Sequence, residues 1–166
     1  MTVMTAEADL GEIIRTGDAV ELVFRRRYAK PLAKVWAALT VPERVADWLA
    51  EYAIDGETIT VTWPEAPYSI TGRIVANEPM RRFAWTWPNN DGSDSVVSFE
   101  LEPDGDGCRL TLRQSGITGR ITGQAAGWHA HLEGLGDAAE GRKTAWATVL
   151  EREKPLNPIY KSRLQE

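Results

Sequence analysis

The stretch GITGRITGQAAGWHAHLEGLGDAAEG, residues 116–141, decides the fold that this sequence predicts. Four of its apolar residues recur at i, i+4, i+7 and i+11: Trp128, Leu132, Leu135 and Ala139. This spacing places them on one stripe of a single long helix, which Gly141 ends. Between Val20 and Ser115, apart from two short helices, apolar and polar residues alternate as in strands. One long helix and one antiparallel sheet predict a two-layer α+β domain, with a curved sheet wrapped around the helix.

Turn residues and prolines predict where the strands and helices on either side of this stretch begin and end. Gly17-Asp18 is a two-residue turn that closes a hairpin between residues 11–16 and 19–29. Two short helices follow, one beginning at Pro31 and one running through Trp48. Further strands are expected at residues 57–63, 68–76, 82–87, 97–101 and 110–112. In the tail, Pro155 and Pro158 predict two separate short helices, over 145–153 and 156–164.

The length of 166 residues, 43% of them hydrophobic, fits one globular domain with a real core. We expect a flexible N-terminus over residues 1–10 and the helix-and-sheet domain over 11–142. A short helical tail over 143–166 should pack on that domain. Trp36, on the first short helix, is expected to be buried and structural.

Charge and composition argue against several classes of function. The net charge is -5 and no run of Lys and Arg forms a basic stripe, so we expect no nucleic-acid partner. The N-terminus lacks the pattern of a signal peptide, and no stretch is apolar enough to span a membrane. A cytoplasmic protein is therefore expected. Cys108 is the only cysteine, which excludes a disulfide framework and a thiolate zinc site.

The two histidines are not arranged to bind a metal together. His129 and His131 lie about 200° apart around a helix, so they point to nearly opposite sides. His131 is next to the apolar stripe and could reach a cavity, whereas His129 is expected to face solvent. No other metal-spaced group and no nucleophile motif is present, so we expect no metal site, no cofactor and no catalytic residues.

The order of strand, two short helices, antiparallel strands and long helix resembles the helix-grip pattern of START-like (SRPBCC) domains. Within that group, KPLAKVWAALTVPERVADWL, residues 30–49, is similar to the entrance of the family related to the C-terminal domain of the activator of heat-shock-protein-90 ATPase. Further short segments similar to that family are Glu78-Pro79, Trp85-Thr86-Trp87 and Gly127-Trp128. The resemblance implies a small-molecule-binding domain. Family members often carry His where this chain has Gln114, and Gln cannot take up a proton.

A curved sheet that grips a helix leaves room for a cavity, and its wall can be predicted. We expect an apolar cavity of about 300–1,000 Å³. Its candidate ligand-binding residues are Arg26, Trp63, Trp85, Gln114, Trp128, His131, Leu132 and Leu135. A packed core is the favoured interpretation of the Trp residues, although an apolar pocket gives the same sequence pattern. Arg26 lies on an apolar strand face, where it either anchors a ligand or pairs with an acidic side chain.

Three functions are compatible with these patterns. The first is non-catalytic binding of a small apolar or aromatic molecule. The second is a cavity enzyme similar to a polyketide cyclase or aromatase, in which His131 or Gln114 orients the substrate. The third is a co-chaperone-type interaction module, although the co-chaperones that name the family carry an additional domain. A homodimer is left open.

Overall fold

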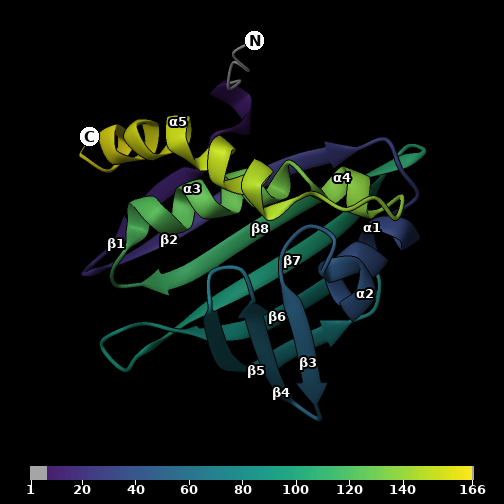
Figure 1. Ribbon diagram of the computed structural model, residues 1–166, viewed down its shortest axis with the longest axis horizontal. Coiled ribbons are helices and arrows are strands. Elements are labelled where there is room, and N and C mark those ends of the chain that lie inside the picture. The colour runs from purple at the N-terminus through teal and green to yellow at the C-terminus, as the bar shows by residue number, and fades with distance from the viewer. Residues whose placement is uncertain (1–6, 166) are drawn as a thin grey trace.

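The computed structural model describes residues 7–165, apart from the side chain of Ala8. Its main feature is an eight-stranded antiparallel sheet in the order β1-β2-β8-β7-β6-β5-β4-β3 (Figure 1). The strands are β1 (Glu12–Thr16), β2 (Ala19–Tyr28), β3 (Glu51–Asp55), β4 (Thr58–Trp63), β5 (Tyr68–Glu78), β6 (Arg82–Pro88), β7 (Asp94–Asp104) and β8 (Gly107–Ile117). The expected hairpin and the expected later strands are all present, whereas β3 was missed. Only Tyr52 of β3 is buried, so this edge strand carries no alternating pattern.

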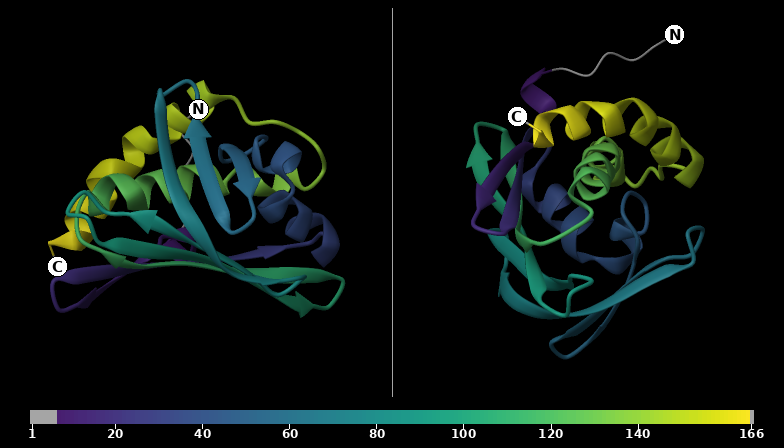
Figure 2. Two further views of the ribbon diagram at one scale, coloured as in Figure 1. Left: turned by 90° about the horizontal axis from the view of Figure 1, so that it is seen from below. Right: turned by 90° about the vertical axis from the view of Figure 1, so that its left-hand side faces the viewer.

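The helices gather on the concave side of the sheet. They are η1 (Glu7–Asp9), α1 (Leu32–Thr40), α2 (Pro42–Val45), α3 (Ile121–Leu132), α4 (Leu135–Ala138) and α5 (Trp146–Leu164). In the right-hand view of Figure 2, α3 is seen nearly end-on inside the curve of the sheet, with α5 lying across its outer side. The α+β helix-grip fold is therefore confirmed. Of the expected flexible N-terminus, residues 1–6 lie outside the described residues.

The single long helix over 116–141 was wrong in its extent. Residues 116 and 117 belong to β8, and α3 ends at Leu132 before the separate turn of α4. A Cβ atom on Gly134 would lie 2.5 Å from Oγ1 of Thr144, so the returning chain packs directly against the break. This close approach requires glycine at a position that the apolar stripe continues across.

The two short tail helices were also wrong, because α5 is one helix with Pro155 and Pro158 inside it. Both prolines are exposed, and the carbonyls that lose a partner can bond water. Val149, Leu156 and Tyr160 are buried and hold the helix against the domain. Their burial offsets the cost of interior proline, about 3 kcal/mol each.

The position of α5 explains why the prediction for His129 was wrong. His129 is 1% exposed, since α3 is covered by the sheet on one side and by α5 on the other. Its Nδ1 lies 2.6 Å from the Tyr160 hydroxyl. The expectation for Trp36 was wrong in degree, because it is half-buried and packs against the core. The fully buried residues of α1 are Val35, Ala38 and Leu39.

Candidate functional site

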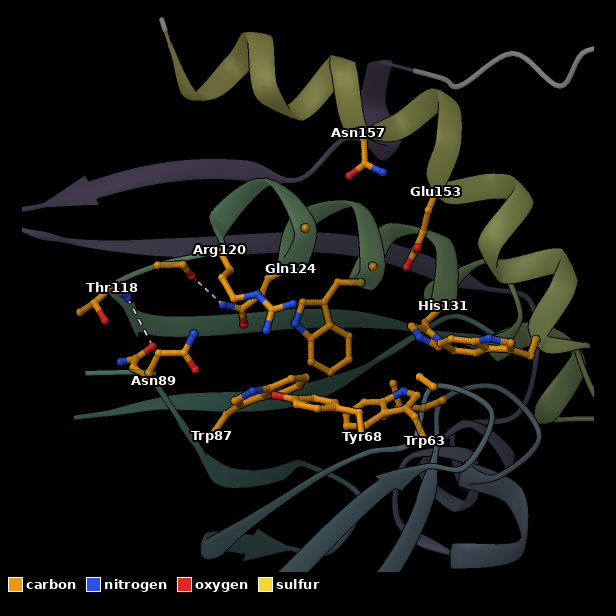
Figure 3. A pocket seen from close by; sticks show the side chains of 18 of the residues that line it. Trp63, Tyr68, Trp87, Asn89, Thr118, Arg120, Gln124, His131, Glu153 and Asn157 are labelled. Carbon is orange, nitrogen blue, oxygen red and sulfur yellow. Dashed lines mark hydrogen bonds between the residues drawn. The ribbon is translucent and has the colours of Figure 1, made fainter. Parts of the chain in front are cut away.

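A cavity of about 640 Å³ opens between α3, α5 and the end of the sheet where β4, β5 and β6 lie (Figure 3). Its aromatic lining is Trp63, Tyr68, Trp87, Trp128 and Trp146. Its polar lining is Asn89, Asn90, Asp91, Thr118, Arg120, Gln124, His131, Glu153 and Asn157. The remaining wall comes from Leu49, Ala66 and three glycines, Gly119, Gly123 and Gly127.

The aromatic side is built from neighbouring strands. Trp63 and Tyr68 are paired across the β4–β5 hairpin, and their ring centres lie 5.5 Å apart. Trp87 on β6 lies 5.5 Å from Trp63 at 41°, and Trp128 of α3 meets Trp87 edge-on at 5.7 Å. Figure 3 shows Trp87, Tyr68 and Trp63 in a row along one wall. Such a row presents ring faces and edges to a flat ligand.

The helical side of the cavity combines the side chains of Gln124, Trp128 and His131 with a face of α3 that carries none. Gly119, Gly123 and Gly127 are spaced by four residues, so they share one face of the chain leading into and along α3. A Cβ atom on Gly123 would meet nothing within 4 Å, and one on Gly127 would meet only Oε1 of Glu153, at 3.5 Å. These glycines keep open space that any larger residue would fill.

Gln114 organises the wall from behind rather than bordering the cavity. It is 1% exposed, and its Nε2 donates to Ser95 Oγ at 2.9 Å and to Gln124 Oε1 at 2.8 Å. Its Oε1 accepts from Trp128 Nε1 at 2.7 Å. All of its principal hydrogen-bonding groups are therefore used inside the protein, and they fix the positions of Trp128 and Gln124.

His131 borders the cavity in a defined tautomer. Its Nδ1 lies 2.9 Å from the carbonyl oxygen of Trp48, which can only accept, so Nδ1 carries the hydrogen. Its ring packs on Trp146 with centres 5.9 Å apart. Burial lowers the pKa of His131, partly opposed by the Trp48 hydrogen bond, and favours the neutral ring. Nε2 is then an acceptor.

Glu153 reaches the cavity from α5 and is half-buried. It forms no hydrogen bond or ion pair with any of the residues 7–165. Burial raises the pKa of its carboxyl, and no neighbouring cation opposes that effect. At the other end of the cavity, Arg120 begins α3 with a left-handed backbone, φ 56°, beside Asn89 and Thr118. Asn89 Nδ2 donates to the Gly116 carbonyl at 2.9 Å, which holds this loop in place.

The eight residues expected from the sequence do not all meet at the cavity. Trp63, Trp128 and His131 border it. Trp85, Gln114, Leu132 and Leu135 are buried and do not border it. Arg26 lies on β2, outside the lining, with its guanidinium 5.8 Å from the Phe24 ring centre and Nη2 buried without a partner. The expected acidic partner of Arg26 is not found among the described side chains.

Sequence reasoning missed the glycine face, Gln124 and Glu153. The four-residue spacing of Gly119, Gly123 and Gly127 was a readable signal for an open helix face. Glu153 carried no signal, because its place depends on how α5 crosses α3. Within residues 7–165, no three His, Cys, Asp or Glu side chains group closely enough to hold a metal ion. None of the helices in that range is long and apolar enough to cross a membrane.

Comparison with known proteins gives matches over most of the chain. CalU16 from Micromonospora echinospora has a similar structure, with a TM-score of 0.72, 23% identity and coverage of 94% of this chain and 96% of its own. DynU16, from the dynemicin biosynthetic locus, has a TM-score of 0.62 at 22% identity, covering 75% of this chain and 48% of its own. A Bordetella avium protein named phosphoribosyl-AMP cyclohydrolase is 29% identical over 118 residues, 68% of this chain and 84% of its own.

The decisive match is to a protein family rather than to a single relative. The model of the family described as activator of Hsp90 ATPase homolog 1-like protein matches residues 29–140, about two thirds of the chain. That range runs from the end of β2 through both short helices, the rest of the sheet, α3 and α4. It contains residues 30–49 and the Gly127-Trp128 pair, two of the segments on which the sequence resemblance rested. The chain therefore belongs to the activator of Hsp90 ATPase homolog 1-like family, within the START-like fold.

Proposed function

We propose that this protein binds a small aromatic molecule in the cavity between α3, α5 and the sheet, and that it does so without chemical conversion. The observation that carries the proposal is a 640 Å³ cavity with five aromatic residues on its walls and with Gly119, Gly123 and Gly127 leaving space along α3. Ligand sites of this size combine apolar walls with a few polar groups that fix orientation. The likeness to DynU16, from a biosynthetic locus for a natural product, supports a small-molecule ligand.

A packed core is the competing explanation for the clustered tryptophans. The two explanations differ in what they expect at the glycine positions. In a core, an empty helix face would be filled, since interiors are close-packed. Gly123 is instead exposed where the cavity opens, an added Cβ atom there would meet nothing within 4 Å, and glycine in an α-helix costs about 1 kcal/mol relative to alanine. A ligand that occupies this space would explain why Gly123 is kept although glycine weakens the helix.

The test is the Gly123→Leu variant with a neutral fluorescent probe, N-phenyl-1-naphthylamine. Wild-type protein is expected to enhance the probe's emission in a saturable titration, with quenching of Trp emission. Gly123→Leu should lose this binding while its melting temperature stays equal or rises, because leucine is the better helix former. Absence of saturable binding to wild-type protein, or unchanged binding in the variant, contradicts the proposal.

Gly56→Asn is a matched control, because it also replaces a glycine with a larger residue. Gly56 lies in the β3–β4 turn with φ 61°, a conformation that asparagine accepts. Nothing lies within 4 Å of its added Cβ, and it is not part of the cavity. Probe binding by Gly56→Asn should equal that of wild-type protein.

A cavity enzyme similar to a polyketide cyclase is the second candidate, and His131 favours it. With Nδ1–H held by the Trp48 carbonyl, Nε2 is an unprotonated base in the cavity wall. An enzyme would convert a linear poly-β-carbonyl compound into a cyclic product with loss of water, and His131→Gln would abolish the conversion. Mass spectrometry of the compound after incubation distinguishes the two functions, since a binder returns it unchanged.

A further inference from the structure

Glu153 is a carboxylate that the fold leaves without a partner although cations lie next to it in the sequence. Arg152 forms two hydrogen bonds to Glu133, at 2.8 and 2.9 Å, and Lys154 pairs with Glu151 at 2.8 Å. Both neighbours are thus paired with other carboxylates, away from the cavity wall that Glu153 joins. A half-buried carboxylate without a counter-ion costs free energy, which a bound cation would recover.

The cavity that this carboxylate borders has aromatic walls, and no neighbouring cation affects the pKa of Glu153. Figure 3 shows Glu153 on the same side of the cavity as His131, whose ring is kept neutral by burial. The indoles of Trp128 and Trp146 line the same cavity, and Gly127 contributes no side chain between Glu153 and the backbone of α3. Ring faces attract cations, and they do so more strongly where water is excluded.

The other charged side chains of the lining do not compensate Glu153. Arg120 lies at the opposite end of the cavity, beside Asn89 and Thr118 (Figure 3). Asp91 is exposed, and its Oδ1 already accepts from the backbone N–H and the hydroxyl of Ser93, at 2.9 and 2.6 Å. The end of the cavity near α5 is therefore an aromatic compartment with one available negative charge.

We propose that the ligand is an aromatic compound that carries a protonated amine, with Glu153 as the counter-ion of that amine. The proposal rests on the proposed function, since it assigns the chemistry of the molecule that the cavity binds. The ring system would lie along Trp87, Tyr68 and Trp63, and the ammonium group would point toward α5. A carboxylate and aromatic faces together select an ammonium group over a neutral hydroxyl of the same size.

The experiment compares two probes that differ only in this group, 1-naphthylmethylamine and 1-naphthalenemethanol. Isothermal titration calorimetry at neutral pH and low salt should give an affinity about tenfold higher for the amine. The isosteric Glu153→Gln variant should lose that tenfold preference and bind the alcohol as wild-type protein does. Glu151→Gln on the exposed side of α5 is a matched charge removal outside the cavity, and it should keep the preference.

The outcomes separate the two proposals. If wild-type protein binds the alcohol but prefers the amine by less than twofold, the amine inference is overturned while the aromatic cavity stands. The same holds if Glu153→Gln keeps the preference, or if Glu151→Gln removes it as strongly as Glu153→Gln. If neither probe binds, the proposed function itself fails. Circular dichroism melting of each variant shows that a loss of preference occurs in folded protein.

Discussion

At the scale of single residues, the Tyr160 hydroxyl connects three parts of the chain. It accepts from the backbone N–H of Gly11 at 2.8 Å and shares a second hydrogen bond with Nδ1 of His129, 2.6 Å away. Tyr160 is fully buried, so both partners depend on it. Tyr160→Phe should therefore lower the free energy of unfolding by about 1–3 kcal/mol, since two buried polar groups lose a partner.

Urea denaturation measures this effect, and Tyr68→Phe provides the comparison. The Tyr68 side chain is exposed and its hydroxyl has no hydrogen bond within the described part of the chain. Removing that hydroxyl should change the unfolding free energy by less than about 0.5 kcal/mol. Equal effects of the two substitutions would show that the Tyr160 hydroxyl does not hold α5 on the domain.

The buried His129 makes stability depend on pH. Burial, assisted by the charge of Arg26, lowers its pKa from an ordinary value of 6.5 to about 4 in the folded protein. Between these values the unfolded chain takes up a proton that the folded protein does not, so stability falls as pH falls from about 6.5 to about 4. The loss should be on the order of 1–3 kcal/mol, since one pKa unit corresponds to about 1.4 kcal/mol.

Urea midpoints measured at pH 7 and pH 5 test this dependence. His129→Gln keeps an oxygen acceptor for Tyr160 but cannot titrate, so its midpoints should differ less between the two pH values. Some dependence should remain, because burial also lowers the pKa of His131. An unchanged difference in the variant would assign the pH dependence to groups other than His129.

At the scale of elements, Gly134 lies at the break between α3 and α4, and Gly136 lies within α4. Gly134→Ala places a Cβ atom 2.5 Å from Thr144 Oγ1 and 3.1 Å from Thr144 Cβ. It should destabilise the protein by about 1–3 kcal/mol through overpacking, despite the higher helix propensity of alanine. Gly136→Ala meets its nearest atoms at 3.7 Å and should be neutral or stabilising. Thermal melting of the two variants checks this. Equal shifts of their melting temperatures would contradict a close approach between Gly134 and Thr144.

The same elements show how far the sequence could predict the structure. Alternation such as Ile59, Val61 and Trp63 predicts a strand, because a half-buried strand has two chemically different faces. The apolar stripe through Trp128 and Leu132 continues to Leu135, yet Gly134 interrupts the helix. That interruption depends on a contact with Thr144, which no local pattern contains. The tail helix survives two prolines for the same reason, since tertiary burial outweighs propensity.

For the candidate site, the sequence predicted the wall better than the polar contacts. Trp63 and Trp128 border the cavity because they lie on periodic faces that the fold turns inward. Gln114 lies on such a face too, but it is satisfied within the protein and does not border the cavity. Glu153 comes from a helix whose crossing over α3 is a property of the whole molecule, so only the structure could reveal it.

At the scale of the whole molecule, the cavity depends on the curvature of the sheet, and Gly72 permits that curvature. A Cβ atom there would lie 1.9 Å from the Thr86 carbonyl oxygen, so β5 crosses β6 in direct backbone contact. The N–H of Arg73 donates to Thr86 Oγ1 at 2.9 Å, and the β5–β6 register shifts between Ile74 and Ala76. Such irregularities bend a sheet at one point.

Gly72→Ala should therefore weaken stability and ligand binding together. The clash is with backbone, which cannot move aside as a side chain can, so the loss should be about 3 kcal/mol or more. Because Trp87 follows Thr86 on β6, the displaced strand also moves the aromatic wall.

The control is Ser69→Ala, on the exposed part of β5, which should change neither stability nor ligand binding. Gly72→Ala should lose both stability and probe binding, whereas Gly123→Leu should lose probe binding alone. This contrast would show that the cavity is shaped by the sheet as a whole. A Gly72→Ala protein with wild-type melting temperature and probe affinity would contradict this account.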